Sequence, residues 1–165
     1  MDEAKEWPLR DQSMENKLDR LKAMGFKVAG QWKQAEGRIT CDLTDFATAT
    51  NVLYGFVVDG EVKYVGKTVK ALRIRMSGYR SPAPTQSTNI KNNAKIAESL
   101  LAGKVVDIYV LPDNGLLHYG GFHVNLAAGL EDSVVRELSP PWNGGQKEAG
   151  NETLEPVAEE PSSPD

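Results

Sequence analysis

Two tyrosines in neighbouring β-rich segments, and an arginine on the segment after them, have the types and spacing for phosphate chemistry. Tyr54 closes the run VLY, Tyr64 opens the run YVG, and Lys67 follows at once. Arg75 and Tyr79 then stand one helical turn apart. Arginine forks onto two phosphate oxygens, whereas lysine is a compact point charge. The pattern indicates a phosphate clamp, although tyrosines in hairpins ordinarily just pack and such cations are ordinarily surface charges.

The middle of the chain is basic, although the formal net charge of the whole chain is −4. Between Glu61 and Glu98 there are eight cations and no acid. This asymmetry fits a surface that faces phosphates, and a solvated basic face is the alternative. The eight cations are Lys63, Lys67, Lys70, Arg73, Arg75, Arg80, Lys91 and Lys95.

A carboxylate and an amide lie in one short segment far downstream of the tyrosines. Glu131 and Asn143 lie twelve residues apart in the run LEDSVVRELSPPWN, with prolines shortly before the asparagine. From the residues alone, Glu131 beside Asp132 on a helix is ordinarily a solvated charge.

Taken together and in this order, these segments resemble the GIY-YIG nuclease family. The resemblance covers residues 51–143; Val52 stands where the family has its first glycine, and only nine residues separate the two tyrosine motifs. It implies a divalent-metal-dependent endonuclease that hydrolyses DNA phosphodiester bonds. The catalytic residues that it implies are Tyr54, Tyr64, Lys67, Arg75, Tyr79, Glu131 and Asn143.

The resemblance makes Glu131 the metal ligand, with Mg²⁺ as the expected ion and Mn²⁺ as a substitute. One carboxylate suffices for Mg²⁺ when substrate phosphate completes the coordination shell. Tyr54 is favoured as the general base and Tyr64 as the residue that positions water or phosphate, but the sequence does not separate the two. A tyrosine base needs nearby cations, because the reference pKa of tyrosine is near 10. Asn143 is expected to hold a loop or the Glu131 helix through hydrogen bonds.

The hairpin turn at Asp59-Gly60 tests whether the tyrosines can share a site. A regular two-residue turn would pair Tyr54 with Val65 and place Tyr54 and Tyr64 on opposite faces. We therefore expect an odd-length loop or a β-bulge, which would bring both tyrosines to one face.

The segment 81–93 (SPAPTQSTNIKNN) is rich in side chains that read base edges or hold phosphates, although a plain polar loop would look the same. It favours site-specific double-strand cleavage of the restriction type by a homodimer on a palindromic site. The alternatives are a structure-specific repair or recombination nuclease and a non-catalytic nucleic-acid-binding module. The residues expected to contact DNA are Lys63, Lys70, Arg73, Arg80, Gln86, Asn89, Lys91, Asn92 and Lys95.

Several other functions are not expected. The 165 residues are 40% hydrophobic and 25% charged, which is typical of a globular chain. No segment is apolar enough to span a membrane and the acidic start does not resemble a signal peptide, so a soluble, cytoplasmic protein is expected. Cys41 is the single cysteine. Glu61 replaces the upstream glycine of a P-loop, so no nucleotide triphosphate is expected. His118 and His123 flank a glycine-rich loop without a third ligand, so no zinc site is expected.

The order of elements in residues 51–143 predicts a mixed α/β (α+β) fold. The family resemblance implies that helices flank a small three-stranded antiparallel sheet. We expect strands at 52–58, 61–66 and 104–111, and helices at 69–79, 89–102 (capped by Thr88) and 126–138 (capped by Asn125). Residues 1–50 are expected to form an N-terminal extension. It has a helix capped by Ser13 and ended by Gly25, a strand near Phe26–Trp32, a strand at 38–43, and a short helix or loop over 42–50. Residues 144–165 hold one Lys and six acids and are expected to be a disordered acidic tail.

Overall fold

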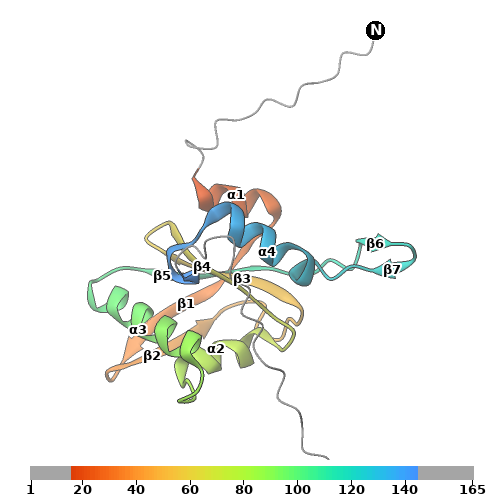
Figure 1. The fold of residues 1–165 in the computed structure, drawn as a ribbon. Coiled ribbons are helices and arrows are strands. Elements are labelled where there is room, and N and C mark those ends of the chain that lie inside the picture. Colours follow the sequence, from red (N-terminus) through yellow and green to blue (C-terminus); the bar gives the residue numbers. More distant parts are fainter. Residues whose placement is uncertain (1–15, 145–165) are drawn as a thin grey trace, which may run out of the picture.

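An antiparallel sheet of five strands runs through the computed structural model, which describes residues 16–144 (Figure 1). The strand order is β2-β1-β5-β3-β4, and a separate two-stranded hairpin is formed by β6 and β7. The mixed α+β class is confirmed. The strands are β1 (Lys27–Ala35), β2 (Arg38–Leu43), β3 (Val52–Val58), β4 (Glu61–Thr68), β5 (Val106–Leu111), β6 (His118–Tyr119) and β7 (Phe122–His123). The helices are α1 (Lys17–Met24), α2 (Leu72–Arg80), α3 (Ser87–Leu101), α4 (Leu126–Leu138) and the 3₁₀ turn η1 (Pro141–Asn143).

The sheet has five strands rather than the three expected, because the N-terminal hairpin joins it. β1 pairs with β2 on one side and with β5 on the other, both antiparallel. Trp32 of β1 is 2% exposed and packs edge-to-face on Phe56 of β3, with ring centroids 5.8 Å apart. Ala29, Trp32 and Ile39 of this hairpin are therefore buried in the same core as residues of β3 and β5.

Helices cover both faces of the sheet. Successive residues of a strand point to opposite faces, and β3 is buried on both. Leu53 and Val57 pack with residues of α1 and α4, whereas Tyr54 and Phe56 pack with residues of α2 and α3. In Figure 1, α1 and α4 lie above the sheet and α2 and α3 lie below it. The tyrosine face is therefore the face of α2 and α3.

The β3–β4 hairpin contains the bulge that the tyrosine geometry requires. Asp59 and Gly60 both have positive φ (46° and 83°), which makes a two-residue turn that pairs Val58 with Glu61. The register then shifts at Lys63, so that Tyr64 pairs with Phe56. The predicted bulge is confirmed, and it brings both motif tyrosines to one face.

The helix ends follow local capping signals in some places only. Asn125 accepts hydrogen bonds from the first turn of α4, as predicted. The predicted Thr88 cap is wrong, because α3 begins at Ser87 with Gln86 at the N-cap position. Asn16 caps α1, and Ser13 lies outside the described residues. Gly25 ends α1 as expected, with φ of 112°.

The loop between β2 and β3 contains no helix, and it supports α2. The backbone N–H of Leu72 donates to the Ala49 carbonyl at 2.9 Å, and that of Arg73 donates to the Ala47 carbonyl at 2.9 Å. These bonds satisfy two donors that the first turn of a helix leaves without a partner. The N-terminal extension therefore fixes the start of the helix that carries Arg75.

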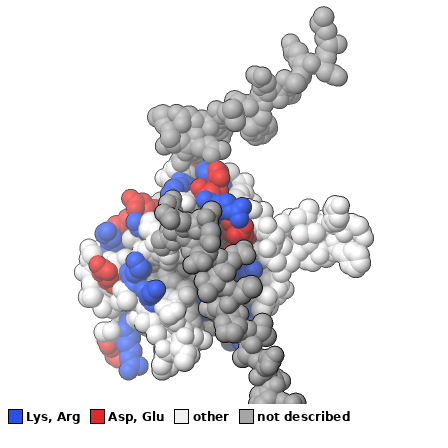
Figure 2. All heavy atoms as spheres, in the orientation of Figure 1, with Lys and Arg blue, Asp and Glu red and all other residues white. Residues whose placement is uncertain are grey.

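The β6–β7 hairpin projects from the body of the protein (Figure 1). It is the white projection in Figure 2, because residues 114–130 include no Lys, Arg, Asp or Glu. Leu116, Tyr119 and Phe122 are each at least 79% exposed.

Within residues 16–144, no helix combines the length and the apolar character needed to cross a lipid bilayer. The expected acidic tail falls almost wholly on residues beyond the described range.

Candidate active site

Three tyrosine hydroxyls meet between the sheet and α2. Tyr54 comes from β3, Tyr64 from β4 and Tyr79 from the last turn of α2. The Tyr54 and Tyr79 hydroxyl oxygens are 2.6 Å apart, and the Tyr79 hydroxyl donates to that of Tyr64 at 3.3 Å. Tyr54 and Tyr79 are fully buried, and Tyr64 retains 8% exposure. The residues that sequence motifs placed far apart thus form one hydrogen-bonded cluster.

Gly66 makes room for this cluster. It lies opposite Tyr54 in the β3–β4 ladder. A Cβ atom on Gly66 would lie 2.7 Å from the Tyr54 hydroxyl oxygen and 2.9 Å from Cε1 of Tyr64. No real Cβ tolerates such contacts, so a side chain at this position would displace both rings. Sequence analysis did not assign a role to Gly66, because the need for it arises from a side chain on the neighbouring strand.

Arg75 holds the tyrosines together. Its Nε donates to the Tyr54 hydroxyl at 3.1 Å, its Nη2 to the Tyr79 hydroxyl at 2.7 Å, and its Nη1 to Oδ1 of Asn89 at 3.0 Å. The guanidinium has five N–H groups. Two therefore remain, one on each terminal nitrogen, and a pair of this kind can fork onto two phosphate oxygens.

The three hydroxyls bind one another within the cluster. Either hydroxyl can donate in the 2.6 Å bond between Tyr54 and Tyr79, and the Tyr79 hydroxyl also lies 3.3 Å from that of Tyr64. Burial raises the pKa of Tyr54 and of Tyr79 above the ordinary value, and this outweighs the opposing effect of Arg75. Both phenols are therefore neutral near pH 7. The buried Tyr54 is not poised to take a proton from water in this conformation.

The remaining expected catalytic residues lie at the edge strand β4 or on the other face of the sheet. Lys67 is exposed and pairs with Leu53, so its side chain leaves β4 on the face opposite the tyrosines. Glu131 lies half-buried on α4, which packs on that same face. The structure thus groups Tyr54, Tyr64, Tyr79 and Arg75, but it does not bring Lys67 or Glu131 into hydrogen-bond contact with them.

Asn143 is bound to the outer edge of β4. Its Nδ2 donates to the Val65 carbonyl at 2.7 Å, and its Oδ1 accepts from the Val65 N–H at 2.9 Å. One amide therefore satisfies both backbone groups of a residue that is 1% exposed. The expectation that Asn143 fixes local structure agrees with this geometry, and the partner is the motif strand itself.

The residues present fit a Mg²⁺ ion only if substrate phosphate and water supply most of its coordination shell. Among residues 16–144, no group of three or more His, Cys, Asp or Glu is arranged to hold a metal. Glu131 supplies one carboxylate, which has no hydrogen-bond or ion-pair partner in the described part of the chain. Mg²⁺ commonly keeps several waters and binds through one carboxylate plus substrate phosphate. Glu131 suits that mode of binding and not a dedicated protein cage.

The expected DNA contacts divide by exposure. Asn92 is 1% exposed and its Nδ2 donates to the Thr88 carbonyl, so its side chain is not available to DNA. Asn89 is 5% exposed and holds Arg75. Lys63 is the bulge residue and forms an ion pair with Glu61 at 2.8 Å. Lys95 is half-buried, with its Nζ 6.0 Å from the ring centroid of Trp142. The exposed members are Lys70, Arg73, Arg80, Gln86 and Lys91.

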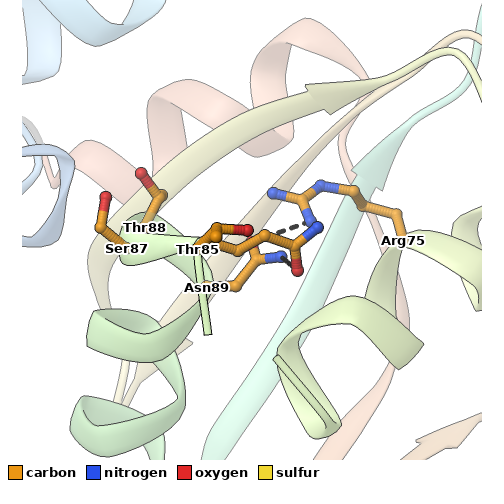
Figure 3. Close-up of a pocket in the computed structure, with 6 residues that line it drawn as sticks. Arg75, Thr85, Ser87, Thr88 and Asn89 are labelled. Atoms are coloured by element: carbon orange, nitrogen blue, oxygen red, sulfur yellow. Dashed lines mark hydrogen bonds between the residues drawn. The ribbon is translucent and has the colours of Figure 1, made fainter. Parts of the chain in front are cut away.

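A polar hollow of about 360 Å³ opens beside Arg75. Figure 3 shows Arg75 reaching from α2 towards the first turn of α3, where the side chains of Thr85, Ser87 and Thr88 surround the opening. The hollow connects the exposed interhelix segment to the guanidinium that binds the tyrosines.

The sequence matches no protein-family model and no curated protein. Among solved structures, the chain is similar to bacteriophage T4 EndoII, solved as a glutamate-to-alanine mutant. The TM-score is 0.63 at 21% identity, over 78% of this chain and 99% of that one. This chain has the fold of T4 EndoII. A restriction endonuclease in complex with product DNA is a weaker match, with a TM-score of 0.45 at 15% identity, over 78% of this chain and 82% of that one. The EndoII likeness extends over nearly the whole EndoII chain, so it concerns the overall fold and not a fragment of it.

Proposed function

We propose that this chain is a divalent-metal-dependent DNA endonuclease of the GIY-YIG type. The observation that carries the proposal is the cluster of Tyr54, Tyr64 and Tyr79 around Arg75. The family resemblance selected these four residues from separate segments, and they share one hydrogen-bond network. The shared fold with the endonuclease EndoII supports the proposal.

Phosphodiester hydrolysis needs an activated water, a counter-charge for the phosphorane and help for the leaving oxygen. In this proposal, Arg75 forks its two remaining N–H groups onto the scissile phosphate, which restrains its orientation and offsets its charge. Glu131 holds the ion together with substrate phosphate, and Mg²⁺ supplies Lewis-acid stabilisation when bound.

The tyrosine that faces the reaction is Tyr64 rather than Tyr54 in this proposal. In the described part of the chain, the Tyr64 hydroxyl contacts the Tyr79 hydroxyl alone, and its own proton has no acceptor there. It also retains exposure that Tyr54 lacks. Tyr54 acts by holding Tyr79 and Arg75 in place. Substrate lies across the sheet edge formed by β4, because this edge borders both the tyrosine face and the α4 face.

We further propose that the cleavage is site-specific, cuts both strands and is performed by a homodimer, with Mg²⁺ replaceable by Mn²⁺. This proposal rests on the polar interhelix segment and its exposed Gln86. Cleavage of unmethylated plasmid and viral DNA by the full chain, with Mg²⁺ or with EDTA, tests it. Discrete fragments with Mg²⁺ alone are expected. Cleavage confined to branched or damaged DNA would replace the restriction role with a repair role. Salt-dependent binding without any cleavage would overturn the nuclease proposal.

A further inference from the structure

Asn89 belongs to the polar interhelix segment that was expected to contact DNA, but its side chain is not free to do so. The side chain is buried and both ends of its amide are occupied. Oδ1 accepts from Nη1 of Arg75 at 3.0 Å, and Nδ2 donates to Oε1 of Gln86 at 2.9 Å. The bond to Gln86 fixes which way the amide points, so that its oxygen faces the guanidinium.

Gln86 continues the chain to the interhelix segment. Its Oε1 accepts from Asn89 and also from the backbone N–H of Ala83 at 3.2 Å. The side chain is exposed and lines the polar hollow. A continuous path of hydrogen bonds therefore runs from the exposed segment through Gln86 and Asn89 to Arg75.

The bond from Asn89 completes the anchoring of Arg75. Tyr54 and Tyr79 hold Nε and Nη2, which leaves Nη1 as the one nitrogen that neither tyrosine binds. With Nη1 on Asn89, all three nitrogens are held before substrate arrives. A free arginine side chain has many rotamers, so this anchoring removes an entropic cost that phosphate binding would otherwise meet.

We infer that Asn89 is a positioning residue, which aims the two remaining N–H groups of Arg75 at the phosphate, and that Gln86 sets the orientation of Asn89. The inference rests on the proposed nuclease function for its effect on cleavage, but the positioning itself does not depend on it. It replaces the expectation that Asn89 contacts DNA directly.

The test compares Asn89→Leu, which removes the acceptor at similar size, with Asn89→Asp, which keeps an oxygen for Nη1. The Gln86 amide can turn to donate to the new carboxylate. Single-turnover cleavage at saturating DNA is expected to fall about 10- to 100-fold in Asn89→Leu. The Kd for DNA is expected to stay within about threefold, and Asn89→Asp is expected to restore most of the rate. A Kd that rises in proportion, with the saturated rate unchanged, would make Asn89 a DNA contact and overturn the inference.

A second readout separates this inference from the nuclease proposal. The ¹⁵N NMR signal of the Arg75 Nη1–H that binds Asn89, assigned by its loss in Arg75→Lys, is expected to be protected from exchange in the wild type and in Asn89→Asp. In Asn89→Leu it is expected to exchange rapidly. Unchanged protection in Asn89→Leu would overturn the positioning role, whether or not the protein cleaves DNA.

The exposed Gln86 gives the same comparison without disturbing the core. Gln86→Glu keeps the oxygen that accepts from Asn89 and Ala83, and Gln86→Met removes it at similar length. Faster Arg75 Nη1–H exchange in Gln86→Met alone supports the path, and equal exchange in both variants overturns it.

Discussion

Burial of the tyrosine hydroxyls decides what each tyrosine can do. Tyr54 and Tyr79 have a raised pKa because their phenols are removed from water, and Arg75 offsets this only in part. A neutral phenol donates and accepts hydrogen bonds but does not abstract protons at pH 7. The cluster is therefore better suited to holding Arg75 than to supplying a preformed phenolate.

This burial predicts a loss of stability in alkali. The pKa of both groups is raised in the folded state, so their contribution is complete below pH ~10 and is lost as the pH rises further. The free energy of unfolding should fall above that pH by ~1.4 kcal/mol per pH unit for each such tyrosine. Urea unfolding from pH 8 to 11 measures this slope. Tyr54→Phe should reduce the slope and the exposed Tyr119→Phe should not. An equal slope in all three proteins would contradict the burial argument.

The sequence identified the residue types of the cluster but not all of their partners. Tyr54, Arg75 and Tyr79 were predicted because they lie in short motifs whose order along the chain is visible in the sequence. The role of Asn89 was missed, because it depends on how α3 packs against α2. The only signal was the pairing of Gln86 and Asn89 at a helix start, and it was interpreted as DNA contact.

At the scale of elements, β4 is an edge strand that pairs with β3 on one side and is bound by Asn143 on its outer side. The Asn143 amide pairs with both backbone groups of Val65 much as a neighbouring strand would. This contact also holds the end of α4 against the motif strand, and α4 carries Glu131.

Removal of this amide should weaken the fold. Asn143→Ala leaves the buried N–H and C=O of Val65 without partners, at a cost of ~2 kcal/mol in the free energy of unfolding. Asn114→Ala, which removes an exposed loop amide, serves as the matched control and should change the stability by less than ~0.5 kcal/mol. Chemical denaturation measures both. Equal effects of the two substitutions would show that the Val65 contact contributes nothing specific.

Two glycines should respond oppositely to alanine. Gly66→Ala drives a methyl group into Tyr54 and Tyr64 and should cost ~1–3 kcal/mol of stability. Gly129→Ala lies inside α4, with its nearest neighbour 3.8 Å away, and should stabilise the helix by up to ~1 kcal/mol. Melting temperatures of the two variants give the comparison. A neutral Gly66→Ala would mean that the tyrosines do not pack as described.

Element boundaries were predicted well where the signals were local. The strands at 38–43 and 52–58 and the helix at 126–138 agree residue for residue with β2, β3 and α4. The start of α3 was wrong, because Pro82, Pro84 and several polar residues offered competing caps. The five-stranded sheet was also missed, since the pairing of β1 with β5 joins residues about eighty positions apart and leaves no local pattern.

At the scale of the whole molecule, the N-terminal strands β1 and β2 and the strands of the tyrosine cluster belong to one sheet. β1 and β2 extend it, and the loop after β2 fixes the start of α2. The exposed cations Arg80 and Lys91 lie on the α2–α3 side, where Asn93 joins the two helices through the Tyr79 and Arg80 carbonyls. This side is where we expect the DNA backbone to bind.

DNA binding should therefore depend on salt, and Arg80 and Lys91 should account for part of the dependence. Each phosphate contact contributes about 0.9 to the slope of log K against log salt concentration. Arg80→Gln and Lys91→Gln should each lower that slope by up to this amount. Lys22→Gln, on α1 at the opposite face, should leave it unchanged. Fluorescence anisotropy of a labelled duplex from 50 to 200 mM salt measures the slopes. An equal loss in Lys22→Gln would place the DNA elsewhere.

The most direct test of the central claim is plasmid cleavage in Mg²⁺ by the wild type, by Glu131→Ala and by Asp132→Ala. Asp132 is the adjacent carboxylate on α4, 81% exposed and paired with Arg136, so it controls for charge and helix position. We predict Mg²⁺-dependent cleavage by the wild type and by Asp132→Ala, and a loss on the order of 10³-fold in Glu131→Ala with DNA binding retained. Equal cleavage by Glu131→Ala and Asp132→Ala, or no cleavage by any of the three proteins, would contradict a metal-dependent nuclease built on these residues.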